Sequence, residues 1–196
     1  MKKLLLIIFS IFVSFQSLAE TPTDFVQTLS DQIITNVLKS TDTQEEKTKR
    51  FEEYFLSALD VQTIGKNVLG RHWKSATEEE RKAFLDAFTD MALKSWADRF
   101  NMYTGQEISF TNETPAQGKN QVFVNSFIQD DPNPISVIWR VSNKNNEYKI
   151  VDIVVEGVSM TLSYRNEYDS FLRDKSLPEL SEQLKKQAEQ FTSKTK

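Results

Sequence analysis

Hydrophobic positions recur every three or four residues in the first half of the chain and then alternate over residues 106–157. The three-and-four spacing over residues 23–39 and 44–57 predicts two amphipathic helices. A shorter helix is predicted between Asp60, which can cap its start, and Gly70, which can end it. The N-terminal half is therefore predicted to be helical.

The clearest local signal is a capping box. Thr77 and Glu80 have the spacing of N-cap and N3 residues, which exchange hydrogen bonds at a helix start. The helix that they begin is predicted to run to about Tyr103, just before Gly105, and a helix of this length is expected to cross a whole sheet. Its apolar stripe comprises Phe84, Phe88, Met91, Ala92, Trp96 and Phe100.

Four alternating segments predict strands joined by short connections, which imply an antiparallel arrangement. They are residues 106–111, 121–128, 135–142 and 148–157. After the last of them, Ser159 can cap an amphipathic helix, and Leu177-Pro178 opens a final one. The order of elements predicts an α+β fold, with a twisted four-stranded antiparallel sheet packed against several helices.

The last predicted strand is apolar on both faces. From Ile150 to Val155 only Asp152 is polar. Such a strand needs an apolar partner on each side. One partner can be the packed core, and the other can be more core or a space that holds an apolar molecule. The pattern alone leaves both possibilities open.

Residues 1–19 have the features of a cleavable signal peptide. A basic start precedes an apolar run, which is too short for a membrane span and ends in small residues. We predict cleavage after Ala19 and export of one domain, residues 20–192, followed by a disordered tail at 193–196. The alternative is a retained anchor.

Composition excludes several classes of function. The absence of Cys excludes disulfides, thiolate catalysis and cysteine zinc sites. A formal net charge of −4 argues against a general nucleic-acid binder. His72 is the only His, and no nucleophile signature surrounds it. We therefore predict no catalytic residue, no metal and no cofactor.

Asp152 keeps one enzymatic hypothesis open. As a polar residue in an apolar strand, it either pairs with a nearby Arg, Lys or backbone group or acts as a general acid or base in an apolar pocket. Arg99, Arg140 and Arg165 pose a similar choice. They are either solvated surface charges or a cluster at a pocket mouth that meets an anionic head group.

Two segments carry a resemblance to a known family. One is Gly157-Val158-Ser159-Met160 followed by Asn166-Glu167, and the other runs from Leu69 to Thr77 and into Glu80-Arg81 and Phe84. With Tyr103-x-Gly105, they make the chain similar to the MlaC/toluene-tolerance proteins, periplasmic phospholipid carriers of Gram-negative bacteria. His72 departs from the family pattern, in which another aromatic residue, commonly Tyr, is expected.

The resemblance implies a deep apolar cavity that holds a diacyl phospholipid, with its tails inside and its head group near the mouth. It implies a periplasmic shuttle, without catalytic residues, in an intermembrane lipid transport system that maintains outer-membrane lipid asymmetry. It also implies two docking partners, an outer-membrane lipoprotein–porin complex and an inner-membrane ABC transporter complex with a substrate-binding ring. We expect the carrier to be a monomer.

On this hypothesis, sheet and helix residues together form the cavity wall. The predicted wall comprises Val124, Val137, Trp139, Ile153 and Val155 from the sheet and Phe88, Trp96, Met160 and Tyr164 from helices. Two other hypotheses stay open: an α+β enzyme that uses Asp152 as a general acid or base, and an envelope interaction protein with a filled core that binds no lipid. An aromatic stripe fits a core as well as a cavity wall.

Overall fold

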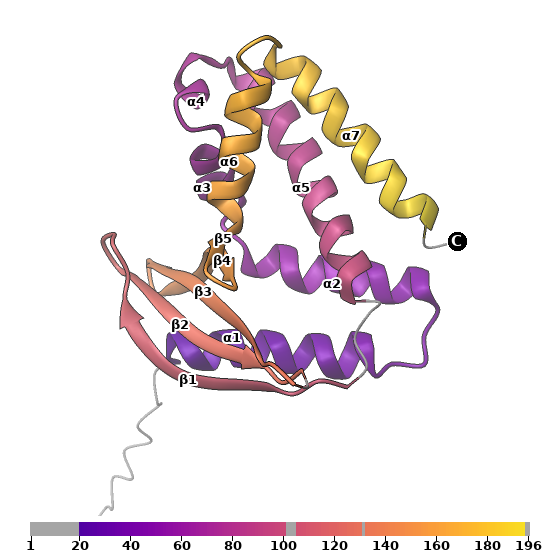
Figure 1. Ribbon diagram of the computed structural model, residues 1–196, viewed down its shortest axis with the longest axis vertical. Helices are drawn as coiled ribbons and strands as arrows, with labels where there is room; N and C mark the ends of the chain where they lie inside the picture. Colours follow the sequence, from indigo (N-terminus) through magenta and orange to yellow (C-terminus); the bar gives the residue numbers. More distant parts are fainter. Residues whose placement is uncertain (1–19, 101–104, 131, 195–196) are drawn as a thin grey trace, which may run out of the picture.

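The computed structural model describes residues 20–100, 105–130 and 132–194, except for the side chains of 98–100 and 192–194. Helices and strands follow one another in the predicted order (Figure 1). Their bounds are α1 Pro22–Ile33, the π-helical segment η1 Ile34–Leu38, α2 Gln44–Ala58, α3 Val61–Leu69, α4 His72–Ser75, α5 Glu78–Phe100, β1 Ile108–Pro115, β2 Gln121–Ile128, β3 Ile135–Lys144, β4 Glu147–Val155, β5 Val158–Ser159, α6 Met160–Phe171 and α7 Leu177–Lys194.

The fold is α+β, as predicted, with one antiparallel sheet in the order β1-β2-β3-β4-β5. The sheet has five strands rather than four, because β5 adds two residues beside the end of β4. Glu156 and Gly157 join these strands, and both have positive φ, at 51° and 77°. Such a turn matches the twist of a tight hairpin. A strand this short cannot produce an alternating pattern.

The edge strand β1 occupies Ile108–Pro115 rather than the predicted 106–111. Its register with β2 shifts between Phe110 and Glu113, which marks a bulge. The bulge breaks the alternation on which the prediction depended. Pro115 is tolerated at the end of an edge strand, where a missing N–H costs little ladder pairing.

Helix starts follow the local sequence signals. The backbone N–H of Thr77 donates to Glu80 Oε2 at 2.9 Å, and that of Glu80 donates to Thr77 Oγ1 at 3.1 Å, so the predicted capping box is confirmed. Asp60 caps α3 and Ser159 caps α6, each by accepting a backbone N–H from the first turn.

The two ends of the chain relate to the predictions in different ways. The predicted signal peptide, residues 1–19, lies outside the described residues. Helix α7 continues to Lys194, and so includes the first residues of the 193–196 segment that we predicted as a tail. Within the described part of the chain, no helix is both long and apolar enough to span a membrane.

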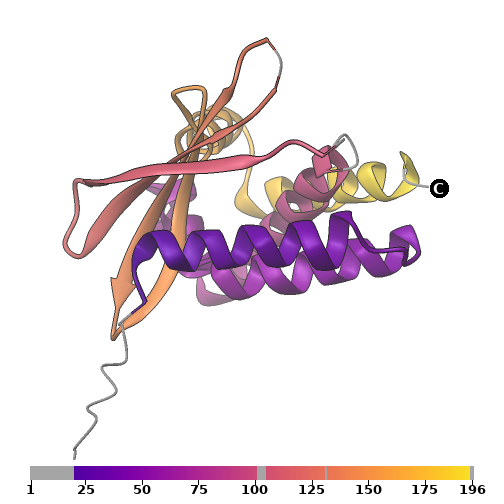
Figure 2. The same cartoon turned by 90° about the horizontal axis from the view of Figure 1, so that it is seen from below.

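The helices form two groups (Figures 1 and 2). In the first, α1 and α2 lie side by side, and α1 packs on β1 and β2. In the second, α5 packs along α7, and α3 packs on α6. The prediction that the long helix α5 crosses the sheet is wrong, because α5 packs chiefly on α7 and other helices, while α1 packs on β1 and β2.

Buried side chains form two main clusters that α5 joins. We call the first the helical cluster; it comprises Val68, Leu69, Phe84, Leu85, Ala87, Phe88, Met91, Tyr168, Leu177, Leu180, Leu184 and Ala188. The second is the sheet cluster, which comprises Leu29, Ile33, Val37, Phe51, Phe55, Ala58, Leu93, Ala97, Val137, Ile150 and Ile153. The N-terminal part of α5 therefore belongs to one core and its C-terminal part to the other.

Candidate functional site

An apolar cavity lies where the helical cluster meets the sheet cluster. Residues of α2, α3, α5, β4 and α6 line it, and most of their side chains are apolar. Its volume is about 60 Å³, which is room for a few water molecules. The cavity stands at the predicted place, between helices and sheet, but it is much smaller than the deep enclosure that we predicted.

Five residues of the predicted wall meet at this cavity. Phe88 and Trp96 project from α5, Ile153 from β4, and Met160 and Tyr164 from α6. Two short-range features bring them together. Helical spacing places the first two on one side of α5, and the tight turn between β4 and β5 starts α6 directly beside β4.

The other four residues of the predicted wall do not line the cavity. Val124 is fully buried beside Val26 of α1, and Val137 and Val155 pack in or against the sheet cluster. Trp139 donates from Nε1 to Ser126 Oγ at 3.0 Å. Val124 and Val137 are thus core residues, and Trp139 and Val155 are partly buried side chains that pack against the core.

Aromatic rings form the helical side of the cavity. The rings of Phe88 and Tyr164 meet edge to face, with centroids 5.4 Å apart and planes at 86°. At the other end, the ring of Trp96 lies 6.2 Å from that of Phe55 on α2. Edge-to-face and tilted pairs are favourable arrangements for aromatic rings. The wall therefore presents large apolar surfaces in defined orientations.

Sequence analysis missed a part of the wall that comes from the α2–α3 corner. Leu59, Val61 and Ile64 line the cavity there. The helical spacing of this segment gave its apolar face but no sign of which element that face meets. Ala92 on α5 and Ile150 on β4 could have been found, since they belong to the aromatic stripe and to the doubly apolar strand.

Asp152 lies in the cavity wall and is 9% exposed. Its carboxylate accepts hydrogen bonds from Ser159 Oγ at 2.6 Å, Thr161 N at 3.0 Å and Ile153 N at 2.9 Å. A buried carboxylate needs such donors, and the start of a helix is a favourable place for negative charge. The group therefore ties the start of α6 to β4, which is the structural alternative that the sequence left open.

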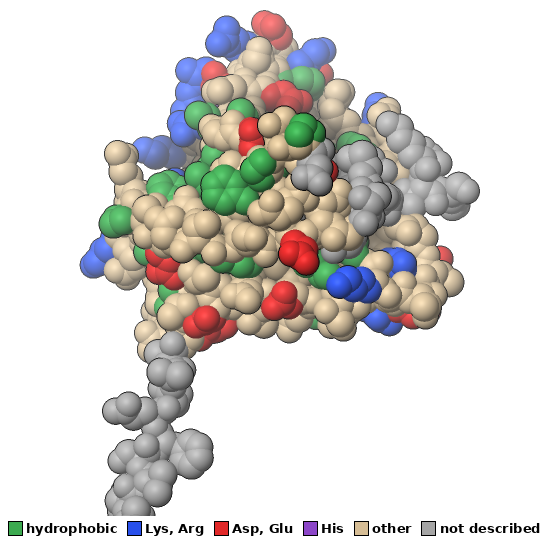
Figure 3. Space-filling view, turned by 60° about the horizontal axis from the view of Figure 1, so that its bottom comes forward, with side chains coloured by type: hydrophobic (Ala, Val, Ile, Leu, Met, Phe, Trp, Pro, Cys, Tyr) green, Lys and Arg blue, Asp and Glu red, His purple; other side chains and the backbone are tan. Residues whose placement is uncertain are grey.

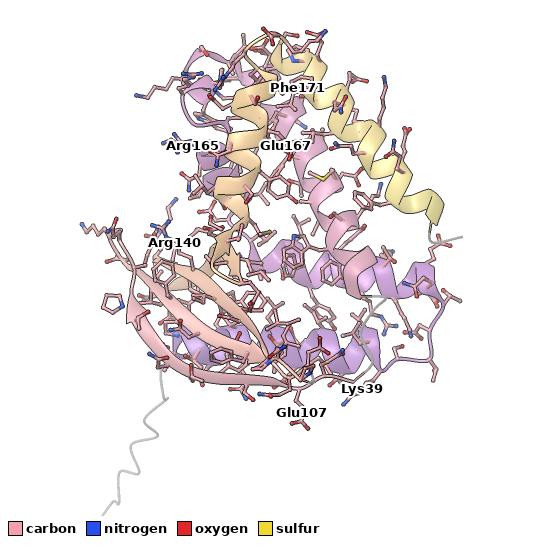
Figure 4. The ribbon with its side chains drawn as sticks, viewed as in Figure 1. Lys39, Glu107, Arg140, Arg165, Glu167 and Phe171 are labelled. Atoms are coloured by element: carbon pink, nitrogen blue, oxygen red, sulfur yellow. The ribbon has the colours of Figure 1, made fainter. Side chains whose placement is uncertain are left out.

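The three predicted basic residues have different surroundings. Arg140 is opposite Asp152 in the ladder, but its Nη2 donates to the carbonyl of Gln117. The guanidinium of Arg165 lies so close to Gly70 that a Cβ there would be 2.8 Å from its Nε. Arg140 and Arg165 lie on the left side of the molecule in Figure 4. Lys and Arg side chains gather along the same side in Figure 3. The side chain of Arg99 lies outside the described residues.

His72 lies away from the cavity, in a surface cluster between α4 and α6. Its Nε2 is 3.0 Å from Asp169 Oδ1, and Arg71 Nη2 is also 3.0 Å from that oxygen. The hydrogen bond with His72 holds the pKa of Asp169 below its ordinary value. Among the described residues, no group of three or more His, Asp or Glu could hold a metal ion.

Comparisons with known proteins agree with this geometry. The family model described as MlaC protein matches residues 24–186. The intermembrane phospholipid transport system binding protein MlaC of Haemophilus influenzae is 30% identical over 109 residues, which are 54% of this chain and 51% of the relative. The chain thus spans about half the length of this curated relative.

A solved structure shares the fold. It is a phospholipid-binding protein from Ralstonia solanacearum in complex with a phospholipid. The two structures superpose with a TM-score of 0.75 over 87% of this chain and 98% of that chain, at 19% sequence identity. At this identity, the likeness shows that the arrangement of helices around the sheet is common to both.

Proposed function

Because the chain belongs to the MlaC family, we propose that it binds a phospholipid and carries it between two membranes, with the acyl chains in the cavity. The observation that carries the proposal is an apolar cavity between helices and sheet, in a fold shared with a phospholipid-bound protein. Phe88, Trp96, Ile153, Met160 and Tyr164 would contact the chains.

Solvation makes a carrier necessary. Two acyl chains contain about 30 CH₂ groups, and each costs roughly 0.8 kcal/mol to expose to water. A lipid monomer therefore crosses an aqueous space at a negligible rate on its own. A protein that replaces this water with apolar side chains removes most of that cost, and catalysis plays no part in the process.

Loading requires the cavity to widen. Its volume of about 60 Å³ is far below the roughly 300–1,000 Å³ of ordinary ligand pockets. The cavity lies at the boundary between the helical and sheet clusters, so movement of these clusters apart would enlarge it without exposing the middle of either. Release at a target membrane would use the same movement, since a rigid enclosure would retain its cargo.

The proposed location is the periplasm, after cleavage of residues 1–19. The proposed partners are the inner-membrane ABC transporter complex with its substrate-binding ring and the outer-membrane lipoprotein–porin complex, in a system that maintains outer-membrane lipid asymmetry. Arg140 and Arg165 are proposed head-group contacts, with Arg99. The resemblance to periplasmic carriers supports the location and the partners, and the name of the Haemophilus influenzae relative supports a role in intermembrane phospholipid transport.

The proposal is tested by identifying the molecule that is bound to the purified protein. Lipid extraction and native mass spectrometry of protein purified from cells should find bound phospholipid, and apo protein should take up lipid from phosphatidylethanolamine–phosphatidylglycerol vesicles. Protein without phospholipid that also fails to take it up would contradict the proposal.

A matched pair of variants locates the binding site. Ala92→Trp fills the cavity from α5, and Ala83→Trp makes the same change at an exposed position of that helix. We expect severalfold less bound lipid for Ala92→Trp only, because the added ring takes the space of the acyl chains. Equal lipid content in the two variants would place the lipid elsewhere.

A further inference from the structure

A second hollow lies on the surface beside the cavity. It is a groove of about 890 Å³ between the outer side of α5 and the corner where α2 meets α3. Leu56, Val61, Leu85 and Leu93 contribute apolar surface to it, and Leu56 is 44% exposed. A half-exposed leucine in a groove offers contact area to an apolar ligand.

The groove and the cavity share part of their walls. Val61, Thr89 and Leu93 line both hollows, so a single layer of side chains separates them. Farther along α3, this helix lies directly against α5, since a Cβ at Gly65 would be 2.2 Å from Leu85 Cδ2. The thin part of the wall is therefore confined to the start of α3.

The two cations at the rim of the groove, Arg81 and Lys82, already have partners within the chain. Lys82 Nζ lies 2.6 Å from Asp86 Oδ2. Arg81 donates from Nε to the carbonyl of Trp73 at 2.9 Å and lies over its ring. With these cations engaged, the groove offers hydrophobic contact more than charge to a ligand. An apolar chain suits it better than a phosphate head group does.

We propose that the groove binds part of one acyl chain of the cargo lipid, which passes from the cavity between Val61 and Leu93. This inference rests on the proposed function. The cavity of about 60 Å³ has room for little of a diacyl lipid, whereas the adjoining open groove of about 890 Å³ is more than ten times larger. Separation of Val61 from Leu93 would join the two spaces, and the chain would stay in contact with apolar surface along its length.

Photo-crosslinking tests the path of the chain. The full chain is loaded from vesicles of phosphatidylethanolamine that carries a diazirine at the end of one acyl chain, then irradiated, and adducts are mapped by mass spectrometry. We expect adducts on groove residues outside the cavity, such as Leu56 and Leu85. Adducts confined to cavity residues such as Ala92 and Met160 would overturn the inference while leaving the carrier function intact. Absence of any bound lipid would instead overturn both.

Two leucine variants sharpen the test. Leu56→Glu places a charge in the groove, and Leu162→Glu makes the same change at a leucine that is 54% exposed and lines neither hollow. We expect about tenfold fewer groove adducts for Leu56→Glu, since a charge opposes burial of a few methylene groups. Thermal denaturation checks that both variants fold. Equal groove labelling in the two variants would overturn the assignment.

Discussion

The helical cluster and the sheet cluster are held together in different ways. Around the sheet cluster, a continuous antiparallel ladder joins β1 to β5 through backbone hydrogen bonds. The helical cluster has no such ladder and depends on side-chain packing between helices, in which the rings of Phe84, Phe88 and Tyr168 contact one another. Hydrogen bonds require narrow geometry, whereas apolar contacts are non-directional. The sheet should therefore keep its shape when the helices shift.

Several specific links join the two clusters. Helix α5 runs through both. The backbone N–H of Asp60 donates to the carbonyl of Ile150 at 3.0 Å, and the carboxylate of Asp152 holds the start of α6. The comparison teaches that the cavity occupies the boundary between a hydrogen-bonded half and a packed half, where movement breaks the fewest directional contacts.

The largest expected effect tests the packed half. Phe84 is fully buried, and Phe84→Ala removes its ring from contact with Phe88 and Tyr168. We expect a loss of about 3–5 kcal/mol in the free energy of unfolding, measured with urea. Phe127→Ala, at a β2 residue that is 36% exposed, is the control and should cost much less. Equal losses would mean that packing in the helical cluster has no special weight.

A close approach between α3 and α5 gives the next effect. Gly65→Ala would place a Cβ 2.2 Å from Leu85 Cδ2, so the buried Leu85 side chain must leave its packed position, at a cost of about 1–3 kcal/mol. Leu85→Ala removes the clashing atom, so the double variant should lose less stability than the sum of the two single variants. Additive losses in urea denaturation would show that the two residues do not meet.

Asp152→Asn acts on the boundary itself. The amide keeps one acceptor but loses the charge that holds Ser159 and Thr161, so we expect about 1–2 kcal/mol less stability. Because α6 is then tied less firmly to β4, exchange of lipid between vesicles should become faster. The enzyme hypothesis for Asp152 makes the opposite prediction, namely loss of turnover with the ligand still bound.

Structural features that depend on signals within a few residues could be predicted from the sequence. The capping box of Thr77 and Glu80 is an example, and so is β2, which occupies the predicted residues 121–128. Each depends on local hydrogen bonding or on an uninterrupted alternation, and neither requires knowledge of the rest of the fold.

The candidate site was only partly predictable, because its place depends on which elements meet. Trp139 and Ile153 are directly opposite each other in the ladder, yet only Ile153 lines the cavity. Alternation gives the face of a strand on which a residue lies, but not what covers that point of the face. Val61 was missed for the same reason, since nothing near it in the sequence indicates that α3 faces β4 and α6.

The smallest effects concern two carboxylates with opposite pKa shifts, one in each half. Burial raises the pKa of Glu52 on α2, an effect that Lys94 opposes and Asp90 adds to. The folded state therefore holds this proton more tightly than the unfolded chain does. Ionisation of Glu52 therefore destabilises the fold at neutral pH, and this penalty fades as the pH falls through the raised folded-state pKa towards the ordinary value of 4.5. Glu52→Gln should accordingly raise the stability of the protein at pH 7.

Asp169 on α6 should behave in the opposite sense. Its pKa is lowered, first by the hydrogen bond with His72, so its contribution to stability is present above the ordinary value of 3.8 and is lost as the pH falls through the folded-state pKa. Asp169→Asn should lower the urea midpoint at pH 7, where Glu52→Gln raises it, and both differences from the wild type should shrink in acid. Shifts of the same sign at pH 7 would contradict this assignment. Asp169, the less deeply buried of the two, should also lose more of its effect in high salt than Glu52, since salt screens the more exposed charge first.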